Sequence, residues 1–272
     1  MFNKILFPIF IAFGLQLSAQ KIWFDADDSL SKVNYYYGLP INSKKTDSYY
    51  IFKNQYALSY NPQKSTANWV AWNLNNGWIG ETDRYKGQFI TDTIIPKKHY
   101  RAKHKDYTNS GFDRGHIVRS KERSNNEINN RSTFLMSNIF PQTPDLNRGL
   151  WLNFEYYCEK LCTQEDKNLF IYAGGVFVSD STLHGKGKIA IPDSCFKIVI
   201  ITDFNNKLPQ INKNTEIIAV MMPNKEGIRR EKWQNYTTTI RNIEVQTSYN
   251  FFSNLPQELQ DSIENKKWNS KP

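Results

Sequence analysis

The sequence predicts a mixed α+β fold with a central antiparallel β-sheet and flanking helices. Segments rich in β-branched and aromatic residues, bounded by Gly, Asn, Asp or Pro, occur in both halves of the chain and indicate strands. One well-marked amphipathic helix pattern lies between the two groups, an order typical of the α+β class. Because the 272 residues contain no internal repeat and no linker rich in Pro, Gly and Ser, we expect one compact domain.

Five segments carry the strand pattern, and a turn signal, Asn61-Pro62, separates the first two. They are residues 49–60, 68–74, 169–178, 196–202 and 216–222. Residues 75–111 hold several Gly, Pro and Lys residues and are expected to be mainly loop. The polar segment 20–48, rich in Tyr and Asn, is expected to be an irregular lead-in to a domain over residues 49–272.

The clearest helix pattern covers residues 147–161, and a final helix is expected over residues 256–267. At spacings of three and four, the apolar face of the first helix is formed by Trp151, Phe154, Cys158 and Leu161.

The N-terminus combines the positive charge of Lys4, an apolar run over residues 5–15 and the small-residue segment Leu17-Ser18-Ala19. This order predicts a secretory signal peptide over residues 1–19. The apolar run is too short for a membrane-spanning helix, which needs about 20 residues, and no later segment is apolar enough. We therefore expect an exported chain, secreted or periplasmic, without a membrane span. A buried N-terminal helix is the alternative.

The formal net charge of +9 falls to +8 if residues 1–19 are removed, because Lys4 is the only charged residue among them. A basic exported protein suits polyanions, namely nucleic acid, acidic polysaccharide or a negatively charged cell surface. Charge by itself does not choose among these partners.

The chain contains three cysteines, Cys158, Cys162 and Cys195, so at least one thiol is unpaired within a monomer. Cys158 and Cys162 lie one helical turn apart, where a bridge is geometrically awkward, and a link from either to Cys195 stays open. No fourth Cys or nearby His completes a zinc ligand set. A packing role is therefore favoured for these residues.

The densest group of chemically active residues is Asp113-Arg114-Gly115-His116, followed by the apolar pair Ile117-Val118. This pattern indicates a histidine at the start of a strand, and Gly115 permits close approach of the backbone beside it. Histidine is the side chain best suited to accept a proton from water near neutral pH. A lone histidine is more often structural than catalytic, so both interpretations of His116 stay open at this point.

A second group begins at Asn138 and reaches Asn147-Arg148-Gly149, and from Asn147 the residues Trp151 and Glu155 follow at spacings of four along the predicted helix. An Asn carbonyl suits Mg²⁺, which keeps several waters and takes few protein ligands. Glu155 lies roughly 12 Å along the helix from Asn147, too far to bind the same ion directly but able to hold a metal-bound water. As an alternative or in addition, Asn147 caps the helix.

Both groups resemble the DNA/RNA non-specific endonuclease family, which carries a DRGH motif and a ββα-metal active-site core. Further segments follow in the family's order, so the resemblance covers about residues 50–256. These segments are Trp69-Val70-Ala71-Trp72, the stretch with Arg84, Phe89 and Asp92, Ala173-Gly174-Gly175-Val176-Phe177, Met222-Pro223-Asn224, and Ile243-Glu244 with Asn250-Phe251-Phe252. The chain departs from the family at Ile117-Val118-Arg119-Ser120, where an apolar residue, Ala and Pro are frequent. It also departs at Thr247-Ser248-Tyr249, where a Gly is usual.

The resemblance implies a role for each motif residue. His116 would be the general base that activates the attacking water. Asn147 would bind Mg²⁺ directly, with Mn²⁺ as a substitute, and Glu155 would complete the metal site by orienting a metal-bound water. Three further residues would act on the phosphate: Asn138 by positioning it, Arg114 by supporting it near the metal, and Arg84 by stabilising its charge.

Basic residues surround the two motifs in sequence and form a predicted track for a phosphate backbone. They are Arg119, Lys121, Arg123, Arg131 and Arg148. Arg148, beside Asn147, and Arg119, beside the His116 motif, are the candidates for substrate binding. The alternative is a solvated polar loop over residues 124–132.

The sequence thus predicts an exported endonuclease that hydrolyses DNA and RNA without sequence preference, uses one Mg²⁺-type metal and, by the resemblance, leaves 5′-phosphate ends. Contacts confined to phosphates give affinity without sequence information. One alternative is a nucleic-acid-binding protein that has this fold but has lost catalysis. Another is a protein that acts on a different exported polyanion. The oligomeric state stays open, with a homodimer among the options.

Overall fold

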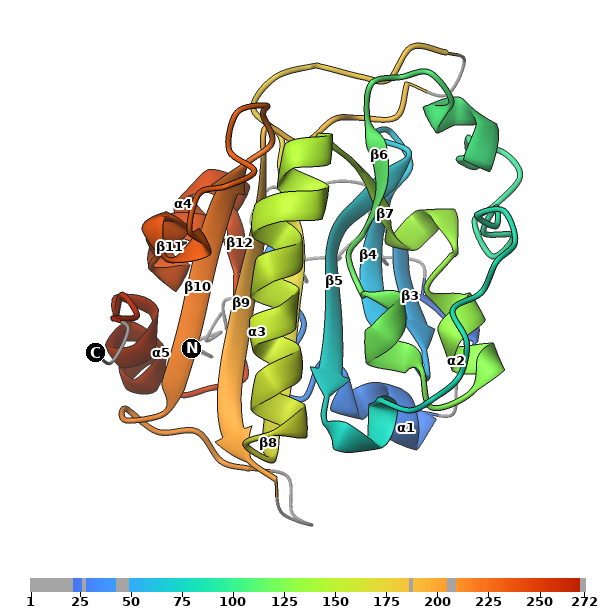
Figure 1. Cartoon of the computed structure of the whole chain (residues 1–272). Coiled ribbons are helices and arrows are strands. Elements are labelled where there is room, and N and C mark those ends of the chain that lie inside the picture. Colours follow the sequence, from blue (N-terminus) through green and yellow to red (C-terminus); the bar gives the residue numbers. More distant parts are fainter. Residues whose placement is uncertain (1–21, 26–27, 43–48, 186–187, 205–208, 270–272) are drawn as a thin grey trace, which may run out of the picture.

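A central β-sheet organises the chain, whose computed structural model describes residues 22–25, 28–42, 49–185, 188–204 and 209–269 (Figure 1). Seven strands of the sheet are antiparallel, and an eighth, β1, runs parallel to β3 at one edge. In spatial order the strands are β1 (Ile22–Asp25), β3 (Tyr49–Lys53), β4 (Ala57–Asn61), β5 (Thr66–Leu74), β8 (Lys167–Val176), β9 (Ser194–Asp203), β10 (Glu216–Pro223) and β11 (Thr237–Thr238). The predicted fold class is confirmed. The predicted signal peptide, residues 1–19, lies outside the described residues.

Each predicted strand segment is present, with one difference at residues 49–60. This segment is a hairpin and not a single strand, because β3 and β4 pair with each other and the Lys53 N–H donates to the Tyr56 carbonyl (3.0 Å) across the turn. The other four segments correspond to β5, β8, β9 and β10, with ends that differ from the prediction by one or two residues.

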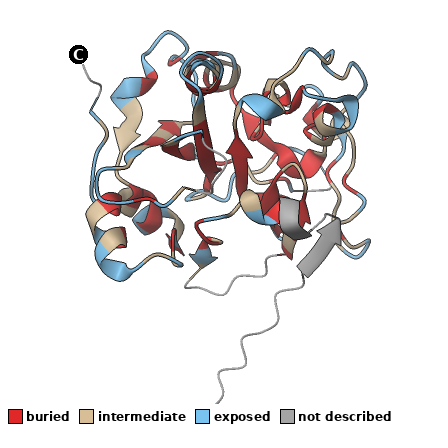
Figure 2. Cartoon of the chain, turned by 90° about the horizontal axis from the view of Figure 1, so that it is seen from below, coloured by how far each residue is buried: buried red, intermediate tan, exposed pale blue. Residues whose placement is uncertain are grey.

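Helices cover both faces of the sheet. The helix α3 (Leu152–Thr163) packs on one face, and α4 (Ile240–Thr247) and α5 (Gln257–Glu264) pack on the other (Figure 1). Successive residues of β8 enter opposite cores, Leu169 the core under α3 and Phe170 the core under α4 and α5. In Figure 2 the strands are buried between these two layers. Strands covered on both faces are apolar throughout, which is why they show little polar alternation.

The predicted helices are confirmed, and all four residues of the predicted apolar face are buried. A π-helical segment, η5 (Leu146–Trp151), precedes α3, and the final helix is α5. The three cysteines are buried and none is in a disulfide. Among the described residues, no helix is both long and apolar enough to cross a bilayer.

The expected irregular lead-in over residues 20–48 contains regular structure instead. Besides β1 it holds α1 (Asp28–Val33) and β2 (Ile41–Asn42), and β2 pairs with β12 (Tyr249–Asn250). The buried Asn34 side chain donates to the Lys53 and Asn54 carbonyls (3.3 and 3.0 Å) and accepts from the Asn73 N–H (3.1 Å). These elements are two to six residues long, which is too short to show a periodic sequence pattern. They form because they pack on partners that are distant in sequence.

A separate two-stranded ladder stands on the α3 side of the sheet. It consists of β6 (Asp113–His116) and β7 (Ile139–Gln142), paired antiparallel, and the chain passes from β7 through η5 into α3. The order strand, strand, helix is the predicted ββα arrangement. Short elements connect these parts: η1 (Asn76–Trp78), η2 (His104–Tyr107), η3 (Ser120–Arg123), α2 (Glu127–Ser132), η4 (Met136–Asn138) and η6 (Trp233–Tyr236). Only η1 and η2 interrupt residues 75–111, which confirms the predicted loop.

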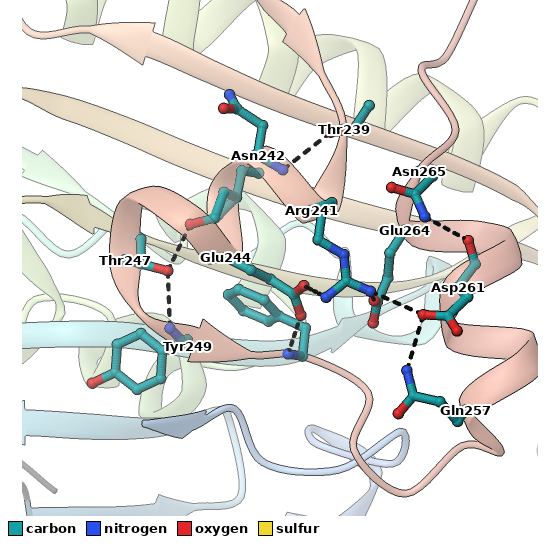
Figure 3. A network of polar contacts seen from close by, with 12 residues as sticks. Thr239, Arg241, Asn242, Glu244, Thr247, Tyr249, Gln257, Asp261, Glu264 and Asn265 are labelled. Carbon is teal, nitrogen blue, oxygen red and sulfur yellow. Dashed lines mark hydrogen bonds and ion pairs between the residues drawn. The ribbon is translucent and has the colours of Figure 1, made fainter. Parts of the chain in front are cut away.

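An ion-pair network joins the two C-terminal helices (Figure 3). The Arg241 guanidinium binds Glu244 (2.7 Å) on its own helix and both Glu264 (2.6 Å) and Asp261 (3.2 Å) on α5. Glu244 also accepts from the Phe251 N–H (2.8 Å), and both glutamates are buried. A single cation therefore holds two buried carboxylates and docks α5 against the sheet.

We predict that Arg241→Ala lowers the free energy of unfolding by about 1–3 kcal/mol, because Glu244 and Glu264 lose their cation while they stay buried. The loss is smaller than for a fully buried pair, since the Arg241 side chain is 40% exposed. Urea unfolding followed by circular dichroism measures it. Arg230→Ala, at an exposed arginine, is the matched control and should change stability little. Equal effects of the two substitutions would contradict the role given to Arg241.

Candidate active site

His116 ends β6 and is fixed by backbone contacts on two sides. It lies opposite Ile139 in the β6–β7 ladder, and its carbonyl accepts from the Trp151 indole N–H (3.2 Å). The Gln142 side chain lies where a side chain on residue 115 would start, so Gly115 is required for this approach of the two strands. His116 is therefore on a strand, as predicted, but at its end and not at its start, because the ladder with β7 already begins at Asp113.

The imidazole of His116 packs against two phenylalanine rings and lies near Arg84 and Arg119. Its ring is 5.1 Å from the ring of Phe89 and 4.8 Å from that of Phe134, and Nε2 makes no hydrogen bond to any described residue. Burial, followed by the charges of Arg84 and Arg119, lowers the pKa of His116 from 6.5 to about 3. The ring is therefore neutral near pH 7, the form that can accept a proton.

Asn147 is held by Asp113. Its Nδ2 donates to Asp113 Oδ2 (2.9 Å), and among the described residues Oδ1 has no hydrogen bond, so the carbonyl oxygen is available to a cation. Asn147 does not cap the helix, as one interpretation held. It lies inside the π-helical segment η5, where its own N–H donates to the Thr143 carbonyl (2.9 Å).

Arg148 is engaged by the same carboxylate. Its Nε and one terminal nitrogen donate to Asp113 Oδ2 and Oδ1 (2.7 and 2.6 Å), and its side chain is 56% exposed. Burial by itself would raise the pKa of Asp113, but hydrogen bonds from Arg148 and Asn147 hold it below its usual range. Asp113 thus stays ionised and orients both residues, a function that the sequence analysis did not assign to it.

The wider turn of η5 changes the side of the helix on which Asn147 lies. A strict α-helix would align Asn147 with Trp151 and Glu155, as predicted, but here Asn147 meets Asp113 while Trp151 and Glu155 are buried against the sheet. Gly149 lets the backbone at Arg229 pack against this turn, since a Cβ there would lie 2.7 Å from the Arg229 carbonyl oxygen. Single π-helical turns of this kind are frequent at functional sites.

Glu155 lies in a buried cluster of charges. Its Oε1 is 3.7 Å from Lys197 Nζ and its Oε2 is 3.7 Å from Arg119 Nε. Burial raises the pKa of Glu155 to about 7, against the opposing charge of Lys197. Glu122 is also buried here and accepts from the Trp72 indole N–H (2.9 Å).

Lys197 is a site residue that the sequence analysis missed. It projects from β9 with 1% exposure, and its Nζ is 4.2 Å from the Trp151 ring centroid. The available signal was a lone lysine inside the apolar run Cys195 to Ile201, since an unpaired lysine is rarely buried.

Two residues predicted to contact phosphate form hydrogen bonds to the protein backbone instead. Asn138 is buried, and its amide donates to the Val118 and Thr133 carbonyls (3.0 and 2.9 Å) while its oxygen accepts from the Val118 N–H (3.0 Å). Arg114 donates twice to the His104 carbonyl (3.0 and 2.7 Å). Asn138 therefore shapes the turn after His116, and Arg114 braces the loop that carries η2.

The predicted basic track is only partly present. Arg123 is buried and donates to the Gln55 and Asn73 carbonyls (2.6 and 2.9 Å), so its inclusion was wrong. Arg84 and Arg119 do lie together beside His116. Arg84 contacts Ser120 and packs 4.8 Å from the Phe134 ring centroid, and Arg119 binds Glu159 (2.5 Å).

These residues fit a metal held mainly by water and substrate oxygen. The described part of the chain contains no group of three or more His, Cys, Asp or Glu side chains that could enclose an ion. One free amide oxygen on Asn147, near the carboxylate of Asp113, is the sparse oxygen set that Mg²⁺ tolerates. When bound, such an ion would stabilise negative charge on the phosphate.

Comparison with known proteins gives a consistent result. Residues 31–258 match the family model described as DNA/RNA non-specific endonuclease. A nuclease of Nostoc sp. is 43% identical over 221 residues, which cover 81% of this chain and 79% of that protein. Human mitochondrial endonuclease G is 28% identical over 214 residues, covering 75% of this chain and 69% of that protein. The crystal structure of an EndoG/EndoGI complex shares the fold, with a TM-score of 0.73 and 20% identity over 86% of this chain and 96% of that chain.

The low pKa of His116 predicts a loss of stability in acid. Unfolded histidine binds a proton below about pH 6.5, whereas folded His116 does so only near pH 3, so its contribution to stability disappears as the pH falls between these values. From about pH 7.5 to pH 5 the wild type should lose about 2 kcal/mol more unfolding free energy than His116→Gln. Urea unfolding of both proteins at the two pH values measures the difference. Parallel losses would show that His116 titrates normally.

Proposed function

Because this chain belongs to the DNA/RNA non-specific endonuclease family, we propose that it hydrolyses DNA and RNA with His116 as general base and one Mg²⁺-type ion at Asn147. Its membership makes it a nuclease, and the proposal concerns the residues, the metal and the place of action. The main support for the proposal is the neutral imidazole of His116. Its Nε2 makes no hydrogen bond to a described residue, and the guanidinium groups of Arg84 and Arg119 lie beside it.

The reaction needs a base on the side of the phosphorus where water attacks. It also needs cations close to the phosphate oxygens on which negative charge develops. In the tautomer with its proton on Nδ1, His116 Nε2 accepts a proton from the attacking water as the new P–O bond forms and the bond to the leaving oxygen breaks. Arg84 and Arg119 stabilise the charge that develops on the phosphate. Mn²⁺ would be the expected substitute for Mg²⁺ at Asn147, whereas Glu155, buried beside Lys197, would act by holding Arg119 in place.

Sequence-independent cleavage fits the same geometry. The charged groups beside His116 recognise phosphate, which every nucleotide carries, and contacts to phosphate contain no sequence information. Arg148, whose side chain is 56% exposed, adds a further cation next to Asn147, although Asp113 already pairs with it.

We predict that His116→Ala lowers the rate of plasmid degradation in Mg²⁺ by at least about a hundredfold, since it removes the proton acceptor. Asn147→Ala should lower activity and raise the Mg²⁺ concentration needed for half-maximal rate. His184→Ala, at an exposed histidine, is the matched control and should retain activity. The mature protein, residues 20–272, is assayed on plasmid and RNA with Mg²⁺, Mn²⁺ or EDTA, and circular dichroism confirms that each variant is folded.

Two outcomes would overturn the proposal. If folded His116→Ala cuts as fast as wild type, another group is the base. If wild type retards plasmid in a gel but cuts under no divalent metal, the chain is a nucleic-acid-binding protein that has lost catalysis.

We also propose export, on the basis of the order of charge, apolar run and small residues within residues 1–19. Cleavage after Ala19 would spare β1, whose Ile22 pairs with Tyr50 of β3. Expression of the full chain in a bacterial host should yield protein outside the cytoplasm whose N-terminal sequence begins at Gln20. Cytoplasmic protein that retains Met1 to Ala19 would contradict export.

A further inference from the structure

A groove of about 430 Å³ extends from the two arginines beside His116 along one side of α3. Its inner end lies near His116, because Arg84 and Arg119, whose charges act on the His116 ring, both belong to its lining, although His116 itself does not. A substrate whose phosphate lies at His116 therefore has room to continue into it.

The far wall of the groove is one face of α3. Tyr156, Lys160 and Gln164 line it at spacings of four residues, a stretch that is roughly 12 Å long in a helix. This is a length for one or two nucleotides and not for an extended double helix.

Positive charge dominates the lining. Arg84, Arg119, Lys121 and Lys160 face a single carboxylate, Glu159. That carboxylate already binds Arg119 at 2.5 Å, so it opposes an incoming phosphate only weakly. The groove thus favours an anion that is continuous with the phosphate at His116.

An aromatic ring is available in the same groove. The Tyr156 side chain belongs to a residue that is 52% exposed, and the Arg119 guanidinium stacks 4.6 Å from its ring centroid. An exposed aromatic ring supported by an arginine is a surface on which a nucleobase stacks without regard to its sequence.

We propose that this groove binds an unpaired nucleotide next to the scissile phosphate, with its base against Tyr156 and its phosphate near Lys160. A base inside a duplex already has neighbours on both faces, so Tyr156 can stack only on a base that is unpaired or splayed out. A volume of about 430 Å³ is also that of a small-ligand site. The inference rests on the proposed nuclease function and adds that single-stranded DNA or RNA is the preferred form of the substrate.

Steady-state kinetics on two substrates test the groove. Oligothymidylate reaches into it, whereas methyl p-nitrophenyl phosphate has only a methyl group beyond the scissile bond. Tyr156→Ala should raise KM for oligothymidylate at least about fivefold, the loss of one stacked base, and Tyr156→Phe should restore it. Lys160→Gln should raise KM and reduce the slope of log KM against log salt by about one. Lys213→Gln, at an exposed lysine remote from the groove residues in sequence, is the matched control.

The pairing state of the substrate gives a second readout. Oligothymidylate annealed to its complement should show a smaller KM change in Tyr156→Ala than the single strand does. Equal changes on both forms would overturn the assignment of an unpaired nucleotide.

Failure of the groove and failure of the proposed function are distinguishable. If Tyr156→Ala loses activity equally on oligothymidylate and on methyl p-nitrophenyl phosphate, Tyr156 acts only by packing on Arg119 and the inference is wrong. If wild type hydrolyses neither substrate, the proposed function is wrong. The groove is then judged by the fluorescence anisotropy of labelled oligothymidylate in EDTA, where unchanged affinity of Tyr156→Ala overturns it.

Discussion

A pair of opposite charges buried between the central sheet and α3 sets the geometry on which the site depends. Lys197 on β9 and Glu155 on α3 approach to 3.7 Å, with side-chain exposures of 1% and 5%. An ion buried without its partner costs several kcal/mol, a large part of the stability of a whole domain. A rotation of α3 on the sheet would separate the pair, so charge pairing adds to apolar packing in fixing the orientation of the helix.

The same pair is linked to His116 through Arg119. Glu155 and Glu159 hold Arg119 in place, and Arg119 lies with Arg84 beside His116, which is half-buried with its Nε2 shielded from solvent. A carboxylate next to His116 would favour its charged form, whereas burial and two cations keep it neutral. The arrangement therefore keeps the imidazole unprotonated near pH 7 and, with the same arginines, places positive charge beside it.

The other half of the site depends on a departure from regular helix geometry. In η5 the π-helical turn directs Asn147 toward Asp113 while Glu155 stays buried against Lys197. The same helix thereby presents the amide oxygen of Asn147 on a partly exposed side and the carboxylate of Glu155 on a buried side. A regular α-helix would have placed both residues on one side. Asp113 completes the arrangement, because its charge orients both Asn147 and Arg148.

Local signals in the sequence determined the strand segments and the apolar face of α3, because each follows from neighbours within a few residues. They also placed His116 on a strand, but at its start, whereas pairing with β7 makes it the last residue of β6. Only the tertiary structure decided what each polar residue does. Arg123 looked like part of a basic surface but is buried on backbone carbonyls, and Asn138 braces a turn. Lys197 looked like an ordinary strand residue, yet it pairs with Glu155, which is 42 positions away in sequence and in contact only after folding. Sequence records the type of a side chain, whereas its charge state and role depend on the partners that folding brings to it.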